Sequence, residues 1–232
     1  IVRFVREARL IASLNHRNIV HVYDHDEDEQ GHYIVMEFIP GLSLAAYCKQ
    51  EGAIAPSKAV ELIKEVCLGL SYAHHKQLIH RDIKPSNILV TSIGSEIQVK
   101  VADFGLASAL NSESRLCESA GTLAFSPPET AWGVADERTD VYSLGVTLYK
   151  LLTGIHPFPV PRLEEVRLSR KFSEVLGKGR RSIRPPSQIL LEKIPELDQL
   201  VMKALSPDIF DRHRNAQEFL DEIRIIEGTL TG

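Results

Sequence analysis

Residues 80–87 read His80-Arg81-Asp82-Ile83-Lys84-Pro85-Ser86-Asn87, and Asp103-Phe104-Gly105 follows sixteen residues after Asn87. Asp82 is placed to accept the proton of a hydroxyl group, and Lys84 can neutralise charge on a phosphoryl group during its transfer. Asn87 and Asp103 offer oxygen atoms to Mg²⁺, a cation that prefers oxygen ligands. These residue types suit phosphoryl transfer from a nucleotide to a hydroxyl, a reaction that depends mainly on positioning and electrostatics.

The acidic and amide residues of this stretch also have a simpler interpretation. Asp82, Asn87 and Asp103 could be helix caps or turn-forming residues, as Asp and Asn often are. Their joint spacing, together with the lysine and the glycine beside them, favours the chemical interpretation.

Upstream of residue 80, the pattern of apolar residues predicts two helices and two strands. Residues 1–14 show helical periodicity, with apolar residues on one face. Residues 19–23 and 33–38 have the composition of strands, and the acidic stretch 24–31 is expected to form the turn between them. Residues 56–76 predict a long helix with an apolar stripe.

Downstream, a short hairpin and further helices are expected. Residues 88–90 and 97–101 are apolar runs on either side of a glycine-containing turn, which predicts two paired strands. Residues 138–153 are apolar almost all round, which predicts a buried helix. The last helix is expected to begin near Asn215, with Glu218 completing a capping box.

The motifs and their order resemble the protein kinase family, whose signature motifs match this sequence from residue 1 to about residue 226. The resemblance implies an α+β fold with two lobes and a helical C-terminal lobe. Residues 1–39 would form a partial N-terminal lobe, with a regulatory helix, two strands and the hinge. Residues 40–232 would form the C-terminal lobe, with the catalytic loop, the activation loop and the substrate-binding helices.

The same resemblance implies the roles of the catalytic and metal-binding residues. Asp82 matches the catalytic base and Lys84 the lysine that accompanies it. Asn87 and Asp103 match the two ligands of Mg²⁺, and ATP is implied as the phosphoryl donor. Gly105 completes the Asp-Phe-Gly motif.

Residues around the expected nucleotide site also match the family. Met36 would be the gatekeeper, and Glu37 and Ile39 would bind adenine through a backbone carbonyl and a backbone N–H group. Leu89 matches the residue beneath the adenine ring. Glu7 matches the glutamate that pairs with the ATP-binding lysine in other members of the family.

Other matching residues are expected to support the site. His80 would pack against Phe104, and these two would form a stack with Ile11 and Val22 that links the lobes. Asp140 would hold the catalytic loop through its backbone, and Glu129 and Arg212 would form a buried ion pair. The remaining histidines of interest, His74, His75 and His156, are expected to be surface or turn residues.

The segment before Glu129 resembles a substrate-binding loop. Thr122 and the run from Lys84 to Asn87 are similar to Ser/Thr kinases rather than tyrosine kinases, and the general style is similar to the bacterial Ser/Thr kinases. Pro127 and Phe125 depart from the residues that are common in this loop. Arg81 can hold a phosphate on the activation loop, so Ser112, Ser114 and Ser119 are candidate phosphorylation sites.

Composition excludes several other classes of protein. Lys and Arg number 27 and Asp and Glu 31, so a net charge of −4 gives no reason to expect nucleic acid as a partner. The implied partner is a protein substrate with a Ser or Thr acceptor. Three widely spaced cysteines indicate a reducing compartment, and no run is long enough to span a bilayer. We expect a cytoplasmic domain, either free or as the cytoplasmic part of a membrane-anchored protein.

The sequence begins at Ile1 without methionine, and no Gly-x-Gly-x-x-Gly occurs in it. We therefore expect the glycine-rich loop and the ATP-binding lysine to lie upstream, and these 232 residues alone to be close to inactive. An active Ser/Thr kinase and a pseudokinase acting as a scaffold or binding module are the two hypotheses. Retention of Asp82, Lys84, Asn87 and Asp103 favours the active kinase.

Overall fold

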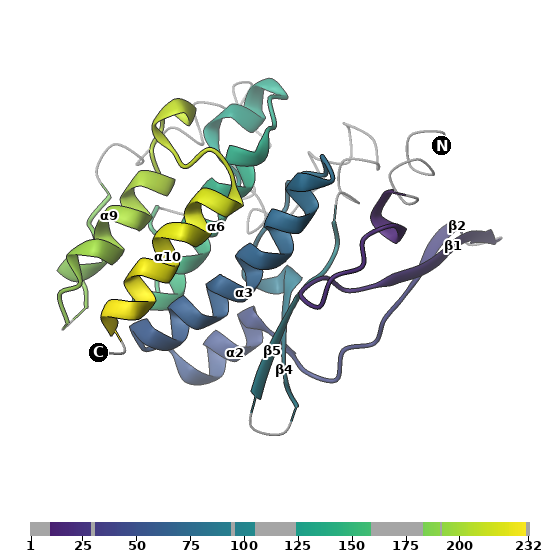
Figure 1. Cartoon of the computed structure of the whole chain (residues 1–232), viewed down its shortest axis with the longest axis horizontal. Coiled ribbons are helices and arrows are strands. Elements are labelled where there is room, and N and C mark those ends of the chain that lie inside the picture. Colours follow the sequence, from purple (N-terminus) through teal and green to yellow (C-terminus); the bar gives the residue numbers. More distant parts are fainter. Residues whose placement is uncertain are drawn as a thin grey trace, which may run out of the picture.

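The computed structural model describes residues 10–28, 31–93, 96–104, 124–158, 183–190 and 192–230. The predicted roles of Glu7, Gly105, Ser112, Ser114, Ser119 and Thr122 lie outside these residues. A two-stranded hairpin lies at one end of the described part, and a body of packed helices lies at the other (Figure 1). The structure is therefore α+β, as the sequence predicted.

Helix α6 (Glu137–Thr153) forms the centre of the helical body and confirms the buried helix predicted over residues 138–153. Asp136 and Thr139 form a reciprocal capping box at its start, and Gly154 ends it with a φ of 73°. Only glycine adopts that left-handed backbone without steric cost. Helix α6 contacts α3 (Pro56–His75), α9 (Pro195–Ala204) and α10 (Ala216–Leu230).

Helix α3 confirms the long helix predicted over residues 56–76. Pro56 occupies its first turn, where the missing N–H group would have had no partner within the helix. The apolar stripe is buried and packs against α10, α6 and the adjoining hairpin. Figure 1 shows α3 between α10 and the strands, so it joins the helical body to the sheet.

The hairpin predicted downstream of the catalytic loop is also confirmed. Strands β4 (Ile88–Ile93) and β5 (Glu96–Val101) are antiparallel, and β3 (Leu42–Ser43) pairs with the other edge of β4. Ile19 forms a parallel bridge with Val101. The segment before β1 therefore contacts the end of β5, two residues before Asp103.

The N-terminal strands differ from the prediction in their bounds. Strand β1 (Val22–Asp28) pairs with β2 (Gly31–Met36), so β1 starts at Val22 rather than at residue 19. The acidic residues up to Asp28 are strand, and their assignment to a turn was wrong. Their side chains are mostly exposed, so the charges remain hydrated while the backbone pairs across the hairpin.

Two helices were not predicted because both are short. In α2 (Leu44–Glu51), the Ser43 hydroxyl accepts a hydrogen bond from the backbone N–H of Ala46 at 3.2 Å and caps the helix. Helix α9 begins with Pro195 in its first turn. Within the described residues, the longer elements are connected by the 3₁₀ turns η1 (Pro85–Asn87), η3 (Pro128–Trp132), η4 (Pro186–Gln188) and η5 (Ile209–Asp211).

The start of α10 contains only half of the predicted capping box. The Asn215 side chain accepts a hydrogen bond from the backbone N–H of Glu218 at 2.9 Å, as predicted. The Glu218 carboxylate instead accepts from the backbone N–H of Arg214, also at 2.9 Å. Among the helices in the described residues, none has both the length and the apolar character to cross a membrane.

Candidate active site

The carboxylate of Asp82 is held by two neighbours from the same loop. Lys84 Nζ lies 2.7 Å from Asp82 Oδ2, and Asn87 Nδ2 donates to the same oxygen at 2.9 Å. Asn87 Nδ2 also donates to the backbone carbonyl of Asp82 at 3.0 Å. The 3₁₀ turn η1 brings these residues together, since it reverses the chain between Lys84 and Asn87. The structure therefore places three predicted site residues in direct contact.

His80 joins this loop to the strand that precedes Asp103. Its Nδ1 accepts from the backbone N–H of Asp82 at 3.2 Å, and its Nε2 lies 2.8 Å from the carbonyl oxygen of Ala102. One neutral tautomer, with the proton on Nε2, satisfies both contacts. The ring packs on Phe104 with 4.5 Å between centroids, so the predicted packing is present. Ile11 and Val22, the other predicted members of the stack, are also buried.

Ala102 fixes the position of Asp103 relative to Asn87. Its backbone N–H donates to the carbonyl oxygen of Asn87 at 2.8 Å, and its own carbonyl accepts from His80. Asp103 follows directly and is exposed, whereas Phe104 beside it is buried. The two predicted metal ligands therefore lie on adjoining segments.

Asp140 holds the backbone of the loop at His80 and Arg81, as the sequence predicted. Its Oδ2 accepts from the backbone N–H of His80 at 2.8 Å, and its Oδ1 accepts from that of Arg81 at 2.8 Å. The side chain is fully buried in the first turn of α6. Burial alone would raise the pKa of Asp140, but hydrogen bonds and charge from His74 and His80 hold that pKa below its usual value.

His74 was wrongly predicted to be a surface or turn residue. It is buried in the last turn of α3, and its Nε2 lies 2.9 Å from Asp140 Oδ2. Its Nδ1 is 3.4 Å from the backbone nitrogen of Ala216, which begins α10. The signal was present, because position 74 continues the apolar stripe one turn after Leu70.

Two residues of the site have a left-handed backbone. Arg81 has a φ of 68° and Asp103 a φ of 61°, values that are costly for residues with a Cβ atom. Asp140 holds the N–H group of Arg81, and Ala102 is held on both sides just before Asp103. These contacts maintain a strained loop in a single geometry.

The predicted hinge runs from Met36 to Ile39 and continues into Pro40 and Gly41. The carboxylate of Glu37 contacts Lys100 Nζ at 2.9 Å, a pair that the sequence did not predict.

The Thr91 hydroxyl donates to the carbonyl of Pro40 at 2.7 Å. A Cβ atom on Gly41 would lie 2.2 Å from the carbonyl oxygen of Val90, so only glycine fits this approach. Leu89, on β4, is partly buried opposite Ser43 and Lys100.

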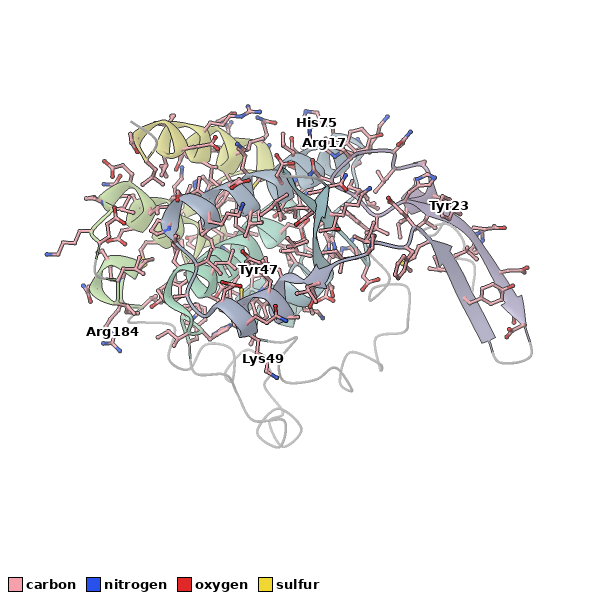
Figure 2. All side chains as sticks on the ribbon, turned by 90° about the horizontal axis from the view of Figure 1, so that it is seen from below. Arg17, Tyr23, Tyr47, Lys49, His75 and Arg184 are labelled. Carbon is pink, nitrogen blue, oxygen red and sulfur yellow. The ribbon has the colours of Figure 1, made fainter. Side chains whose placement is uncertain are left out.

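The loop between the first described helical residues and β1 is fixed on α3. Asn18 is fully buried, and its Nδ2 donates to Glu65 Oε2 at 2.8 Å and to the carbonyl of Val99 at 2.9 Å. Arg17 contacts the same Glu65 oxygen at 2.9 Å from the surface (Figure 2). Gly69 permits the crossing, because a Cβ there would lie 2.9 Å from the Asn18 carbonyl oxygen.

The predicted ion pair between Glu129 and Arg212 is present and bidentate. The two N–O distances are 2.7 and 2.9 Å, and the Arg212 side chain is fully buried. Arg212 also donates to the carbonyl of Ser206 at 2.8 Å and stacks on the Tyr142 ring. The segment at Glu129 is thereby joined to the connection between α9 and α10.

Asn87 and Asp103 fit the chemistry of a magnesium site. The amide nitrogen of Asn87 is used on Asp82, and its amide oxygen, which accepts a hydrogen bond from the Ser86 hydroxyl at 3.3 Å, has a second lone pair that could face a cation. The described residues contain no group of three or more His, Cys, Asp and Glu side chains that could hold a metal alone. Mg²⁺ is usually held by one or two carboxylates together with substrate phosphates and water.

Comparison with known proteins matches residues 2–223 to the protein kinase domain. The serine/threonine-protein kinase PknB of Mycolicibacterium smegmatis is 40% identical over 237 residues, which cover 98% of this chain and 36% of that protein. The serine/threonine-protein kinase PrkC of Bacillus subtilis is 34% identical over 225 residues, with coverages of 96% and 33%. The chain thus spans about a third of the length of these two relatives.

A similar fold occurs in a solved structure, the crystal structure of Rad53 residues 1–466 in complex with AMP-PNP. The TM-score is 0.70 and the sequence identity 26%, and the match covers 96% of this chain and 54% of that chain.

Proposed function

Because the chain belongs to the protein kinase domain family, we propose that it transfers the γ-phosphate of ATP to serine and threonine hydroxyls of protein substrates. The observation that carries this proposal is the contact of Asp82 with Lys84 and Asn87, in a loop anchored by Asp140. The proposal assigns Asp82 as the base, Lys84 as the cation and Asn87 as a metal ligand, and it is supported by the contact of Asp82 with the other two. The names of the bacterial relatives support the choice of Ser and Thr as acceptors.

In the proposed reaction, Asp82 accepts the proton of the acceptor hydroxyl. Its Oδ2 is engaged by Lys84 and Asn87, so Oδ1 is the atom that would receive that proton. The hydroxyl oxygen forms a bond to the γ-phosphorus, and the bond from that phosphorus to the bridging oxygen of ADP breaks. Lys84 lies close enough to Asp82 to neutralise charge on the phosphoryl group as that group moves from ADP to the acceptor oxygen.

We propose that Asn87 and Asp103 would hold Mg²⁺ through side-chain oxygens. The bound ion would supply positive charge to the phosphate oxygens of the nucleotide. The adenine ring would be surrounded by Met36, Glu37, Ile39 and Leu89. This assignment is supported by the position of these residues on β2, the hinge and β4. Glu7 would pair with the ATP-binding lysine, and it lies outside the described residues.

We further propose that phosphorylation of the activation loop regulates the domain through Arg81. The Arg81 Nε atom is buried and has no hydrogen-bond partner among the described residues. A phosphate on Ser112, Ser114 or Ser119 would satisfy it, although these serines lie outside the described part. Replacing all three serines with alanine should lower activity, and unchanged activity would place regulation elsewhere.

The domain organisation and location follow the same proposal. Residues 1–39 would belong to the N-terminal lobe and residues 40–232 to the C-terminal lobe, with the nucleotide between them. We propose a cytoplasmic location, since Cys48 and Cys67 are both free thiols and cellular ATP is needed.

The test is a transfer assay on the full natural protein that contains these residues, with labelled ATP, Mg²⁺ and a generic protein substrate. Phosphoserine and phosphothreonine should form, and Asp82→Asn should reduce their formation by about 10²–10⁴-fold while nucleotide binding persists. Predominant phosphotyrosine would contradict the proposed acceptor. Nucleotide binding by the unmodified protein without transfer would instead support a binding module.

A further inference from the structure

Lys100 is a buried cation that the proposed reaction does not use. Its side chain is 9% exposed and lies on β5, three residues before Asp103. Its Nζ contacts Glu37 Oε2 at 2.9 Å and the carbonyl of Ile19 at 3.3 Å. A charge removed from water is costly unless it is paired, and the contact with Glu37 supplies that partner.

Glu37 is bonded to His21, the residue before β1, as well as to Lys100. Its Oε2 accepts from the backbone N–H of His21 at 3.1 Å, and its own N–H donates to the His21 carbonyl at 2.8 Å. Partial burial would raise the pKa of Glu37, but hydrogen bonds from Lys100 and the His21 N–H hold that pKa below its usual value. Glu37 is therefore a carboxylate at neutral pH, and it lies 2.9 Å from Lys100 Nζ.

The direction of Lys100 places this pair beside the proposed adenine site. Lys100 and Leu89 are directly opposite in the antiparallel β4–β5 pair. Opposite residues in such a pair project from the same face of the sheet. Lys100 therefore rises from the face that carries Leu89, the residue proposed to lie beneath adenine, and reaches the hinge at Glu37.

The hinge is attached to the same hairpin at its other end. Thr91, also on β4, donates its hydroxyl proton to the carbonyl of Pro40, and Gly41 lies against the Val90 carbonyl. Phe38 and Ile39 are held between these two attachments, and the side chain of Phe38 is 85% exposed. The backbone that would bind adenine is thus attached to the β4–β5 hairpin on both sides.

We propose that Glu37 and Lys100 form a hinge latch, an ion pair that positions the hinge backbone for adenine. The inference rests on the proposed nucleotide site and deepens it. Both residues are positioning residues, because they act through the backbone of residues 37–39. Since Lys100 lies on the strand that leads to Asp103, the latch also joins the adenine end of the site to its metal end.

The test measures the binding of adenosine, which carries no phosphate, to the full natural protein by calorimetry. Lys100→Met and Glu37→Gln should each weaken adenosine binding by about tenfold, and the double variant should weaken it no further. The KM for ATP should rise by a similar factor, while kcat at saturating ATP changes by less than about twofold. Lys58→Met, which removes an ion pair with Glu61 on α3, is the matched control and should leave both quantities unchanged.

Thermal melting separates the latch from a pair that only stabilises the fold. A lower melting temperature with unchanged adenosine affinity in both single variants would overturn the proposal, and so would fully additive losses in the double variant. If Lys100→Met does not fold, Glu37→Gln decides alone, because the amide keeps the shape of the side chain and removes only its charge. An unmodified protein that transfers phosphate, with variants that bind adenosine normally, defeats the latch alone. An unmodified protein that neither binds adenosine nor transfers phosphate defeats the proposed function as well.

Discussion

The carboxylates of this site differ in their surroundings, and the difference matches their proposed roles. Asp140 is fully buried among three hydrogen-bond donors and is suited to hold a backbone. Asp82 is partly exposed beside Lys84, where it can meet a substrate. Asp103 is exposed on a left-handed backbone, where it can meet a cation. One residue type therefore serves three purposes because of its neighbours.

Asp103→Asn should raise the Mg²⁺ concentration needed for half-maximal transfer, because an amide is a weaker ligand for a hard cation than a carboxylate. Adenosine binding should stay unchanged, since adenosine needs no metal. Titration of the transfer rate with Mg²⁺ provides the measurement. Asp221→Asn on the surface of α10 is the control and should leave the titration unaltered. An identical Mg²⁺ requirement in Asp103→Asn would remove Asp103 from the metal site.

His74→Ala should destabilise the protein by about 1–3 kcal/mol, because it removes one donor from the buried Asp140 carboxylate. Phosphate transfer should fall as well, since the N–H groups of His80 and Arg81 depend on that carboxylate. Chemical denaturation and the transfer assay measure the two effects.

His75→Ala is the matched control for this variant. His75 is the next residue along α3 and is exposed at the surface (Figure 2). Equal losses of stability in the two variants would show that the contact of His74 with Asp140 has no special weight.

Among the described elements, the hairpin β4–β5 has several attachments to the site. It carries Leu89 and Lys100, receives the hinge at Thr91 and ends at Val101, two residues before Asp103. Strand β3 pairs with it, and the segment at Ile19 bridges to it. A change in the fit between this hairpin and the hinge should therefore alter nucleotide binding more than it alters the helical body.

Gly41→Ala should weaken adenosine binding, because its Cβ atom would lie 2.2 Å from the Val90 carbonyl oxygen and force the hinge away from β4. The strain of such overpacking is about 1–3 kcal/mol. Calorimetry gives the affinity and thermal melting gives the stability. Gly228→Ala in α10, where a Cβ meets nothing within 4 Å, should leave adenosine binding as it was. Unchanged binding in Gly41→Ala would show that the hinge tolerates displacement.

The start of α10 should lose stability in acid. A backbone hydrogen bond from Arg214 lowers the pKa of Glu218 from its usual value to about 2, with further help from Arg214 and Lys203. A carboxylate with a lowered pKa in the folded state stabilises the protein above pH 4.5, and that contribution disappears as the pH falls towards 2. Glu218→Gln should reduce stability at pH 7 and flatten its dependence on pH in that window, as followed by denaturation at several pH values. A steep dependence that survives in the variant would assign the effect to other carboxylates.

The ion pair of Glu129 with Arg212 joins parts of the molecule that are far apart in sequence. Arg212 lies after α9, and Glu129 lies in η3 before α6, so the pair links these two parts of the helical body. The Arg212 guanidinium also lies over the ring of Tyr142 in α6. Both residues are almost completely shielded from water. The cohesion of this region depends on both charges being present together.

Glu129→Ala should cost about 3–5 kcal/mol of stability, because it leaves the Arg212 guanidinium buried without its carboxylate. The double variant Glu129→Leu with Arg212→Met should lose less than the sum of its single changes. Denaturant unfolding measures each variant. Strict additivity would mean that the two residues act independently, despite their contact.

The predictions that held rest on short-range patterns. The long helix over 56–76, the buried helix over 138–153 and the hairpin after Asn87 each follow from periodicity and turn residues within one segment. The two-lobed kinase fold was implied by the resemblance of the motifs to the protein kinase family. The contacts of His80 with Phe104 and of Glu129 with Arg212 were predicted only through family resemblance.

The linear sequence was therefore enough to identify the family, and the resemblance to that family supplied the proposed reacting side chains. It was not enough to show that His74 and Lys100 are buried. The acidic run in β1 is strand because the neighbouring strand β2 supplies its hydrogen-bond partners. His74 and Lys100 are buried because the fold places Asp140 beside His74 and Glu37 beside Lys100. A charge or an imidazole can leave water only where folding brings a partner to it, and those partners are 66 and 63 residues away along the chain.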